Sequence, residues 1–413
     1  MHSLPRLALY IIVALGVAVV TACGTASSHT GEPEGGGFRS PDATSWDSSQ
    51  TGAGEGGQTQ GGEDAETPAS DGGAPGDASA DATVEAGDAN FDLDGDSGGP
   101  TFPEGGCPST SLTAGDYSQT VATDGGTRTY RLHIPPGLSS SVPAPLVFAF
   151  HGGGQTAAQF EGFAHVYPKS DASGFILVEP EGTPALPGLE AGVLDVWNAG
   201  NCCEAAAQVN KNVDDVGFVA AMLDSVESQI CVDPKRVFAT GFSNGGMLSH
   251  RLACQMSDRI AAIAAVSGGL GNRNLDVNPV TTLFPCTPGR SVPVLHIHGT
   301  QDACYPFDGG LGPLSFVTFE AALTTVQGWA ARNGCSSNPT TVLTNGAATC
   351  QLYPCPHPGE VELCTIDGGG HYWPGGDDWP GSQVFCGANQ GVRSADLIAN
   401  DAFWSWFTAH PMP

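Results

Sequence analysis

Basic side chains are scarce in this sequence. Its 413 residues include 14 Lys and Arg against 43 Asp and Glu, which gives a formal net charge of −29 at pH 7. A chain of this charge repels the phosphate backbone of nucleic acids. We therefore exclude nucleic acid as a partner.

Long apolar runs are also scarce. Residues 7–22 (LALYIIVALGVAVVTA) form an uncharged apolar run that follows Arg6 but is short for a membrane span. This pattern predicts residues 1–23 as a signal peptide. Residues 20–23 (VTAC) resemble the bacterial lipobox, in which Cys23 would be lipidated after cleavage. We expect an extracellular or outer-membrane-surface protein that touches the membrane only through this lipid, with ordinary secretion as the alternative.

Zinc-module spacing is missing among the cysteines. Removing Cys23 from the 13 cysteines leaves 13 − 1 = 12, an even number. In an exported domain this predicts up to six disulfides, whose pairing the sequence leaves open. Zinc is the alternative, but no paired CxxC motifs are present, so we expect no metal site and no cofactor.

Large apolar residues are rare in residues 24–105, which are rich in Gly, Ser, Asp and Glu. Such a stretch buries too little apolar surface to fold, so we predict a disordered acidic tether. Its residues 95–99 (GDSGG) match Gly-x-Ser-x-Gly around Ser97, but no strand precedes them, and we interpret them as linker. The folded domain should span residues 106–413, enough for one core.

Apolar runs alternate with amphipathic segments in residues 106–413. This alternation predicts an α/β fold, a mostly parallel sheet flanked by helices. The predicted elements are a hairpin over 117–134, buried strands at 144–150, 174–179, 237–239, 261–266, 292–297 and 361–366, and helices at 213–230 and 316–332.

A second Gly-x-Ser-x-Gly match has the context that the first one lacks. Residues 241–245 (GFSNG) stand between an apolar strand and a segment with helical spacing. A strand, a sharp turn and a helix together form a nucleophile elbow, which exposes the serine hydroxyl. Ser243 is therefore the candidate nucleophile, and the Asn244 N–H is the first candidate oxyanion donor.

An acid and a base follow Ser243 in the chain. Asp302 lies just past the strand at 292–297, and His371 just past the strand at 361–366. The order Ser, Asp, His is that of α/β-hydrolases, in which histidine takes the serine proton and aspartate orients the imidazole. His296 and His298 are rival bases inside a strand, and Asp308 is the alternative acid.

The strand at 144–150 runs into residues 151–155 (HGGGQ), which resemble the loop that supplies the second oxyanion donor in esterases. Gly153 is the candidate donor. Glycines there let the backbone approach a substrate without a Cβ in the way.

These motifs occur together in one known family. Residues 107–410 resemble the secreted esterases of carbohydrate esterase family one, which include feruloyl esterases and poly(3-hydroxybutyrate) depolymerase-like lipoproteins. The segments that carry the resemblance are 151–155, 179–182 (EPEG), 196–200 (VWNAG), 214–218 (DDVGF), 241–247 (GFSNGGM), 298–302 (HGTQD) and 369–375 (GGHYWPG).

The resemblance implies a monomeric esterase with a polysaccharide or polyester substrate. Feruloyl or acetyl esters of plant polysaccharide are the first expectation, and polyhydroxybutyrate is the second. An inactive hydrolase fold serving as a surface-binding module is the alternative of another class. Trp197 and Trp373 are candidate walls of the acyl pocket, because flat apolar rings stack on aromatic acyl groups.

Overall fold

The computed structural model describes residues 107–108, 112–185, 188–202, 213–312, 317–356, 358–379, 381–387 and 390–413. The predicted signal peptide, Cys23, the tether and Ser97 lie outside these residues. The described residues are built around one large sheet.

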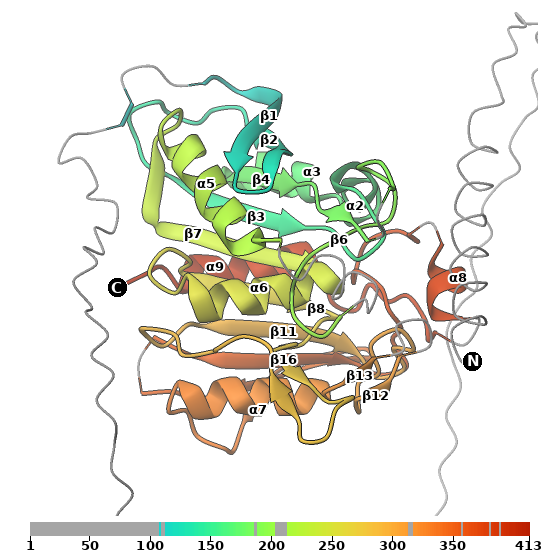
Figure 1. Ribbon diagram of the computed structural model, residues 1–413. Coiled ribbons are helices and arrows are strands. Elements are labelled where there is room, and N and C mark those ends of the chain that lie inside the picture. Colours follow the sequence, from blue (N-terminus) through green and yellow to red (C-terminus); the bar gives the residue numbers. More distant parts are fainter. Residues whose placement is uncertain are drawn as a thin grey trace, which may run out of the picture. The chain divides into compact units, whose positions relative to one another are not determined.

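One ten-stranded sheet runs through the domain (Figure 1), in the order β1-β2-β4-β3-β7-β8-β11-β16-β15-β14. Neighbours from β4 to β16 pair in parallel, and antiparallel strands extend both edges. The bounds are β1 Gly115–Thr123, β2 Gly126–Ile134, β3 Ala144–Phe150, β4 Ile176–Pro180, β7 Val232–Phe242, β8 Ala262–Val266, β11 Val294–Gly299, β14 Thr340–Asn345, β15 Ala348–Tyr353 and β16 Val361–Ile366.

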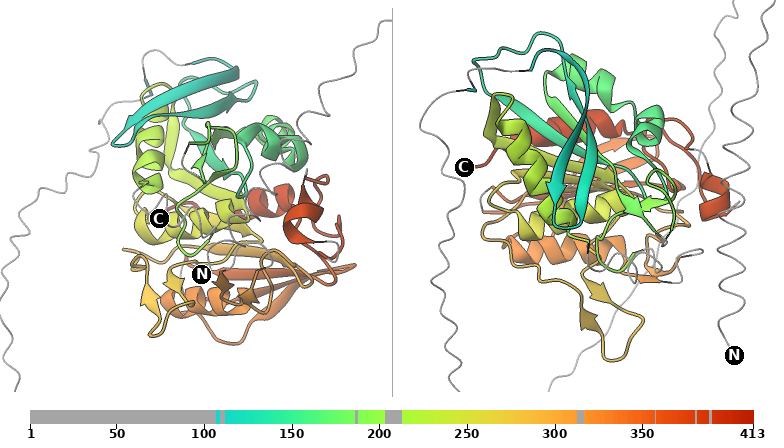
Figure 2. Two further views of the ribbon diagram at one scale, coloured as in Figure 1. Left: turned by 45° about the vertical axis from the view of Figure 1, so that its right-hand side comes forward. Right: turned by 45° about the horizontal axis from the view of Figure 1, so that its top comes forward.

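Helices cover both faces of the sheet (Figures 1 and 2). One buried cluster joins the sheet to α5, α6 and α7, and a second joins its other face to α2, α3 and α9. This arrangement confirms the predicted α/β-hydrolase class. The bounds are α2 Ala157–Ala164, α3 Val166–Ser173, α5 Asp215–Glu227, α6 Asn244–Gln255, α7 Ala322–Arg332 and α9 Ala399–Ala409.

Short strands and one short helix lie in the loops that follow the parallel strands. Because the carboxyl ends of parallel strands meet at one edge, these loops gather on one side of the sheet. In the right-hand view of Figure 2 the gold hairpin of β9 and β10 projects from the lower side of the domain. The elements are β5 Thr183–Pro184, β6 Asp195–Val196, β9 Arg273–Asn274, β10 Thr281–Thr282, β12 Gly310–Leu311, β13 Thr318–Phe319 and α8 Ser382–Cys386.

The predicted elements differ from the observed ones mainly at their ends. The helix expected over 316–332 begins only at Ala322, because Thr318 and Phe319 pair with β12 as a short strand. The antiparallel edge strands β14 and β15 were not predicted. The six residues of β14 are all exposed, so this strand lacks the alternating pattern that indicates a half-buried strand.

Five disulfides join described cysteines, which confirms the predicted disulfide framework. Disulfides persist in oxidising compartments, so their number fits an extracellular location. The pairs are Cys107–Cys231, Cys254–Cys286, Cys304–Cys386, Cys335–Cys355 and Cys350–Cys364.

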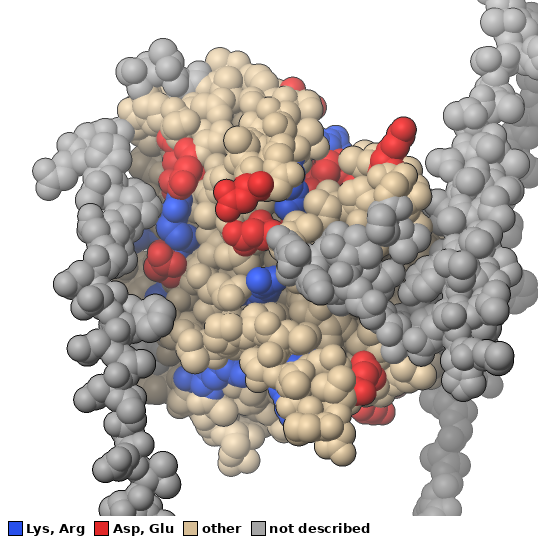
Figure 3. Space-filling model, in the orientation of Figure 1, with Lys and Arg blue, Asp and Glu red and all other residues tan. Residues whose placement is uncertain are grey.

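The surface shown in Figure 3 carries few basic side chains, and they are scattered among acidic and uncharged residues. Among the described helices, none combines the length and the apolar character needed to cross a membrane.

Candidate active site

Ser243 lies at the tight turn between β7 and α6. Its backbone has φ 55° and ψ −118°, a conformation that non-glycine residues rarely adopt, and its N–H donates to the Val266 carbonyl oxygen at 2.8 Å. A residue held in such a conformation costs on the order of 1–3 kcal/mol and persists only where its surroundings enforce it. The turn has the strained geometry of a nucleophile elbow.

The two glycines that flank Ser243 are required by close backbone contacts. A Cβ on Gly241 would lie 2.5 Å from the Gly245 carbonyl group, and a Cβ on Gly245 would lie 2.3 Å from the Phe150 carbonyl oxygen. The start of α6 therefore packs directly on the end of β7 and on the loop after β3. This packing is the physical reason for small residues on both sides of the serine.

Asp302 and His371 form a buried pair beside the elbow. Asp302 follows β11, His371 follows β16, and His371 Nδ1 lies 2.7 Å from Asp302 Oδ2. The His371 ring centroid is 4.7 Å from that of Phe242, the residue before Ser243. The fold thus gathers the three predicted residues from three strand ends that are far apart in the sequence.

The second oxygen of Asp302 is also occupied. Its Oδ1 accepts hydrogen bonds from the backbone N–H groups of Cys304 at 2.9 Å and Tyr305 at 2.8 Å. Burial by itself would raise the pKa of Asp302, but His371 and a hydrogen bond from His298 lower it below the usual range. Asp302 is therefore ionised at neutral pH and is suited to hold the His371 ring by its Nδ1–H.

The glycine loop after β3 leaves one backbone donor available. The Gly152 N–H donates to Gln155 Oε1 at 2.9 Å, and the Gly154 N–H donates to the Asp195 carbonyl oxygen at 2.7 Å. The Gly153 N–H, in contrast, donates to no other described residue. Gly153 is thus the glycine of this loop that is free to bind an oxyanion.

Asn244 is the first residue of α6, so its N–H has no acceptor inside the helix. Its side chain is engaged elsewhere: Oδ1 accepts from the Trp197 N–H at 2.6 Å, and Nδ2 donates to the Trp197 carbonyl oxygen at 3.2 Å. The backbone N–H groups of Asn244 and Gly153 are therefore both free to donate to a bound group.

His151 begins the glycine loop but is no general base. It is fully buried, and this burial lowers the pKa of His151 to about 4. Its Nε2 accepts a hydrogen bond from the Gly182 N–H at 3.0 Å. The neutral ring anchors the loop to the chain after β4.

The two tryptophans expected as pocket walls lie in the core, and this corrects the expectation. Trp197 is 1% exposed and Trp373 is 0% exposed. The Trp197 indole N–H donates to the His151 carbonyl oxygen at 2.9 Å, and that of Trp373 donates to Asn400 Oδ1 at 2.9 Å. Trp197 therefore stabilises the glycine loop through this hydrogen bond, and neither ring is exposed to a substrate.

Two other apolar side chains lie beside the glycine loop. A Cβ added to Gly154 would lie 3.6 Å from both Leu194 and Phe385, so these half-buried side chains flank the glycine loop. The Phe385 ring packs against Trp379 at 5.9 Å between centroids. Neither residue was predicted; Phe385 lies on the five-residue helix α8, which is too short to show a periodic pattern.

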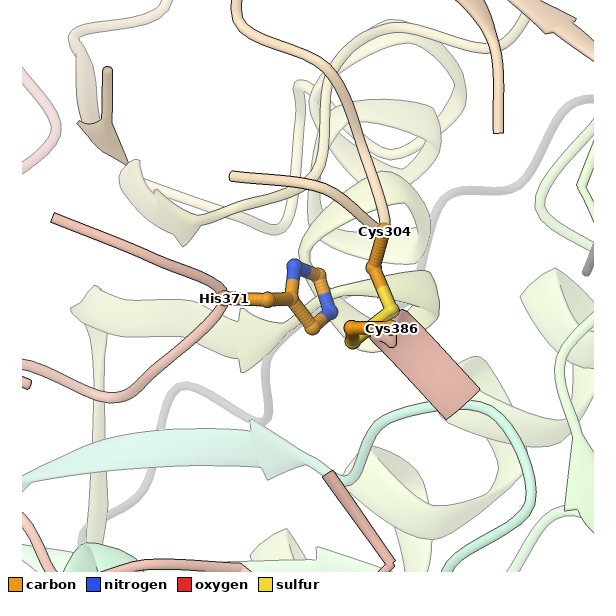
Figure 4. Close-up of side chains that lie close together, drawn as sticks. All are labelled: Cys304, His371 and Cys386. Carbon is orange, nitrogen blue, oxygen red and sulfur yellow. A yellow bond between two sulfur atoms is a disulfide. The ribbon is translucent and has the colours of Figure 1, made fainter. Parts of the chain in front are cut away.

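A disulfide ties α8 to the catalytic loops. Cys304, two residues after Asp302, is bonded to Cys386 at the end of α8. Figure 4 shows this disulfide beside the His371 imidazole, and the two sulfur atoms and a ring nitrogen lie within 4.8 Å of one another. Metal binding by cysteine needs a thiolate, and both sulfurs are already in a disulfide.

Comparison with known proteins identifies esterases that are similar to this chain. Residues 139–313 match the phospholipase/carboxylesterase family. Feruloyl esterase B of Piromyces equi is 33% identical over 242 residues, 58% of this chain and 41% of that protein. Feruloyl esterase C of Emericella nidulans is 30% identical over 293 residues, 68% of this chain and 84% of that protein.

Among solved structures, an acetyl xylan esterase from Aspergillus awamori superposes with a TM-score of 0.46 at 16% identity, over 71% of this chain and 99% of that chain. The chain spans less than half of feruloyl esterase B but most of feruloyl esterase C. By its match to feruloyl esterase C, the chain belongs to the feruloyl esterase family of α/β-hydrolases, the family that its motifs predicted.

Proposed function

We propose that this protein is a serine carboxylic-ester hydrolase that removes feruloyl or acetyl groups from plant polysaccharide esters. The observation that carries the proposal is the buried Asp302–His371 pair, 2.7 Å apart, beside the strained turn of Ser243. The feruloyl esterases among its relatives support the substrate class.

The proposed reaction begins with Ser243. His371 Nδ1–H donates to Asp302, so the neutral ring presents Nε2 as the base that takes the serine proton. The serine oxygen attacks the ester carbonyl, and the resulting oxyanion accepts hydrogen bonds from the Asn244 and Gly153 N–H groups. His371 then protonates the leaving alcohol, and water releases the acid from the acyl-enzyme by the same steps in reverse.

A substrate panel tests the proposal. We expect the wild-type protein to hydrolyse methyl ferulate, acetylated xylan and p-nitrophenyl acetate, and Ser243→Ala to lower turnover by about 10⁶-fold while the protein stays folded. Ser97→Ala is the matched control, since Ser97 stands in the other Gly-x-Ser-x-Gly match. Release of hydroxybutyrate from polyhydroxybutyrate with no activity on the other esters would instead assign a depolymerase.

The proposal includes a location and a domain plan. The monomeric hydrolase domain of residues 106–413 would be exported, with Cys23 lipidated and residues 24–105 serving as its tether. The residues that support this are the apolar run 7–22 and the VTAC segment. Mass spectrometry of the mature N-terminus made in a bacterium should find lipid on Cys23, and an unmodified terminus at another residue would leave ordinary secretion.

A further inference from the structure

Three buried histidines form a continuous chain behind the candidate triad. His250 Nε2 lies 3.3 Å from His296 Nδ1, and His296 Nε2 lies 3.0 Å from His298 Nδ1. His250 comes from α6, and the other two come from β11. All three are 0% or 1% exposed, so no bulk water completes their hydrogen bonds.

At the end of this histidine row that is farther from Asp302, the partner group is a hydrogen-bond donor. The Trp329 indole N–H, on α7, donates to His250 Nδ1 at 3.0 Å. Because an indole nitrogen has no acceptor capacity, His250 Nδ1 must be unprotonated, and its proton must lie on Nε2. It follows that His250 Nε2–H donates to His296 Nδ1. His296 Nδ1 is then unprotonated, so His296 Nε2–H donates to His298 Nδ1.

At the end of the histidine row next to Asp302, the partner groups of His298 are hydrogen-bond acceptors. His298 Nε2 lies 2.9 Å from the Tyr305 carbonyl oxygen and 3.4 Å from Asp302 Oδ2. Neither oxygen can donate, because the first is a carbonyl and the second belongs to an ionised carboxylate. His298 Nε2 must therefore carry the proton. The two ends of the chain require the same orientation of all three rings.

Burial and nearby groups favour the neutral state of His250 and His296, the two rings farther from Asp302. Burial and, to a smaller extent, the charge of Arg332 lower the pKa of His250 to about 3, although a hydrogen bond to the Gly268 backbone acts in the opposite direction. Burial and the two neighbouring rings lower the pKa of His296 well below its usual value. Asp302 is the charged group at the other end, and it faces His298.

We propose that His250, His296 and His298 form a neutral, one-directional hydrogen-bond relay, oriented by Trp329, that positions Asp302 for its work with His371. This inference rests on the proposed function of the site. The two histidines that competed with His371 as candidate bases are then positioning residues behind it.

The relay completes the surroundings of Asp302. Oδ1 accepts two backbone N–H groups, and Oδ2 faces both His371 Nδ1–H and His298 Nε2–H. If the three rings took the opposite tautomer, His298 would turn a lone pair toward Asp302 Oδ2 and toward the Tyr305 carbonyl. That contact is repulsive, and the carboxylate would lose a donor that favours its charged form.

The tautomers can be measured without any substrate. Nitrogen-15 spectra of imidazole-labelled wild-type protein at pH 7.5, assigned with single His→Gln variants, distinguish protonated from unprotonated ring nitrogens. We expect the Nε2–H tautomer at all three positions. Finding the Nδ1–H tautomer, a mixture or a doubly protonated ring at any of the three would overturn the relay, whether or not the protein hydrolyses esters.

Kinetics test whether the relay acts on Asp302. We expect His298→Leu to lower kcat at least about tenfold with KM unchanged, because a hydrogen bond to a charged group is lost. His298→Gln, whose amide can still donate, should recover most of this loss. Equal kcat in His298→Leu and wild type, with the variant folded by circular dichroism, would show that the relay is structural only.

A matched pair of tryptophan variants tests the role of the indole donor to His250. Trp329→Phe removes the donor that orients His250, and we expect kcat to fall about threefold to tenfold. Trp406→Phe removes another buried indole N–H, one that has no partner among the described residues, and should leave kcat unchanged. Equal kcat in the two variants would overturn the role of Trp329.

A wild-type protein that is inactive on every ester would refute the proposed function alone, because the nitrogen-15 spectra would still determine the tautomers of the three histidines.

Discussion

The two sides of the candidate site are held by different kinds of contact. The proposed catalytic wall consists of Ser243, Asp302 and His371, which stand at the ends of sheet strands and are fixed by backbone contacts and buried hydrogen bonds. We propose Leu194 and Phe385, which lie beside the glycine loop, as the substrate wall. Phe385 lies on the five-residue helix α8, which is attached through side chains and the Cys304–Cys386 disulfide.

Because of this difference, we expect catalysis and substrate preference to depend on different sides of the site. Backbone atoms within 2.5 Å of a missing Cβ leave no room for a larger residue at Gly241 or Gly245, so the backbone around Ser243 is tightly constrained. Side chains on a short helix can change in size with little effect on the sheet. We therefore expect changes in the catalytic wall to remove activity and changes in the substrate wall to alter which ester is preferred.

The largest expected effect comes from the acid of the catalytic wall. Asp302→Asn should lower kcat by about 10⁴-fold, the size seen for this change in a serine protease triad, because the amide no longer stabilises the correct imidazole tautomer. Steady-state kinetics with p-nitrophenyl acetate measure it. Asp308→Asn is the control and should have no effect; the reverse result would make Asp308 the third member of the triad.

Gly245→Ala tests the backbone packing of the same wall. Its Cβ would lie 2.3 Å from the Phe150 carbonyl oxygen, so α6 or the glycine loop must move. We expect a loss of about 3 kcal/mol in the free energy of unfolding, measured by urea denaturation, as for other overpacked sites. Gly162→Ala, in α2, meets no atom within 4 Å and should be neutral or slightly stabilising. Equal stabilities would contradict the close packing of the elbow.

The histidines behind the catalytic wall should make it sensitive to acid. His250 has a folded pKa of about 3, so between pH 6.5 and 3 the unfolded chain binds a proton that the folded protein excludes. Stability then falls as pH falls through this window, on the order of 3 kcal/mol by pH 4. His250→Gln lacks this term. The stability advantage of wild type over His250→Gln should therefore shrink from pH 7 to pH 4, and a constant difference would contradict the lowered pKa.

The smallest effect is expected at the substrate wall. Phe385→Ala should lower kcat/KM for methyl ferulate about tenfold relative to p-nitrophenyl acetate, because an aromatic acyl group loses an apolar contact while an acetyl group does not reach it. Leu311→Ala, at a side chain 64% exposed on β12, should change neither value. An equal fall for both substrates would place Phe385 in the support of the catalytic wall instead.

Local patterns in the sequence were enough for the central strands and for the order of the three candidate catalytic residues. Buried parallel strands read as continuous apolar runs, and Ser243, Asp302 and His371 each follow such a run. The same reasoning could not assign Trp197 and Trp373. An aromatic residue beside a motif has the same local pattern in a core as on a pocket wall, and its burial depends on elements distant in the chain.

The sequence by itself therefore determined the central strands of the sheet, the turn of Ser243 and the presence of disulfides, because strand periodicity, turn chemistry and cysteine number are local or compositional properties. Only the tertiary structure decided the disulfide pairs, the free donor at Gly153, the wall of Leu194 and Phe385, and the alignment of His250 with His296 and His298. Each of these depends on which side chains from separate strands and helices meet when the sheet closes its core.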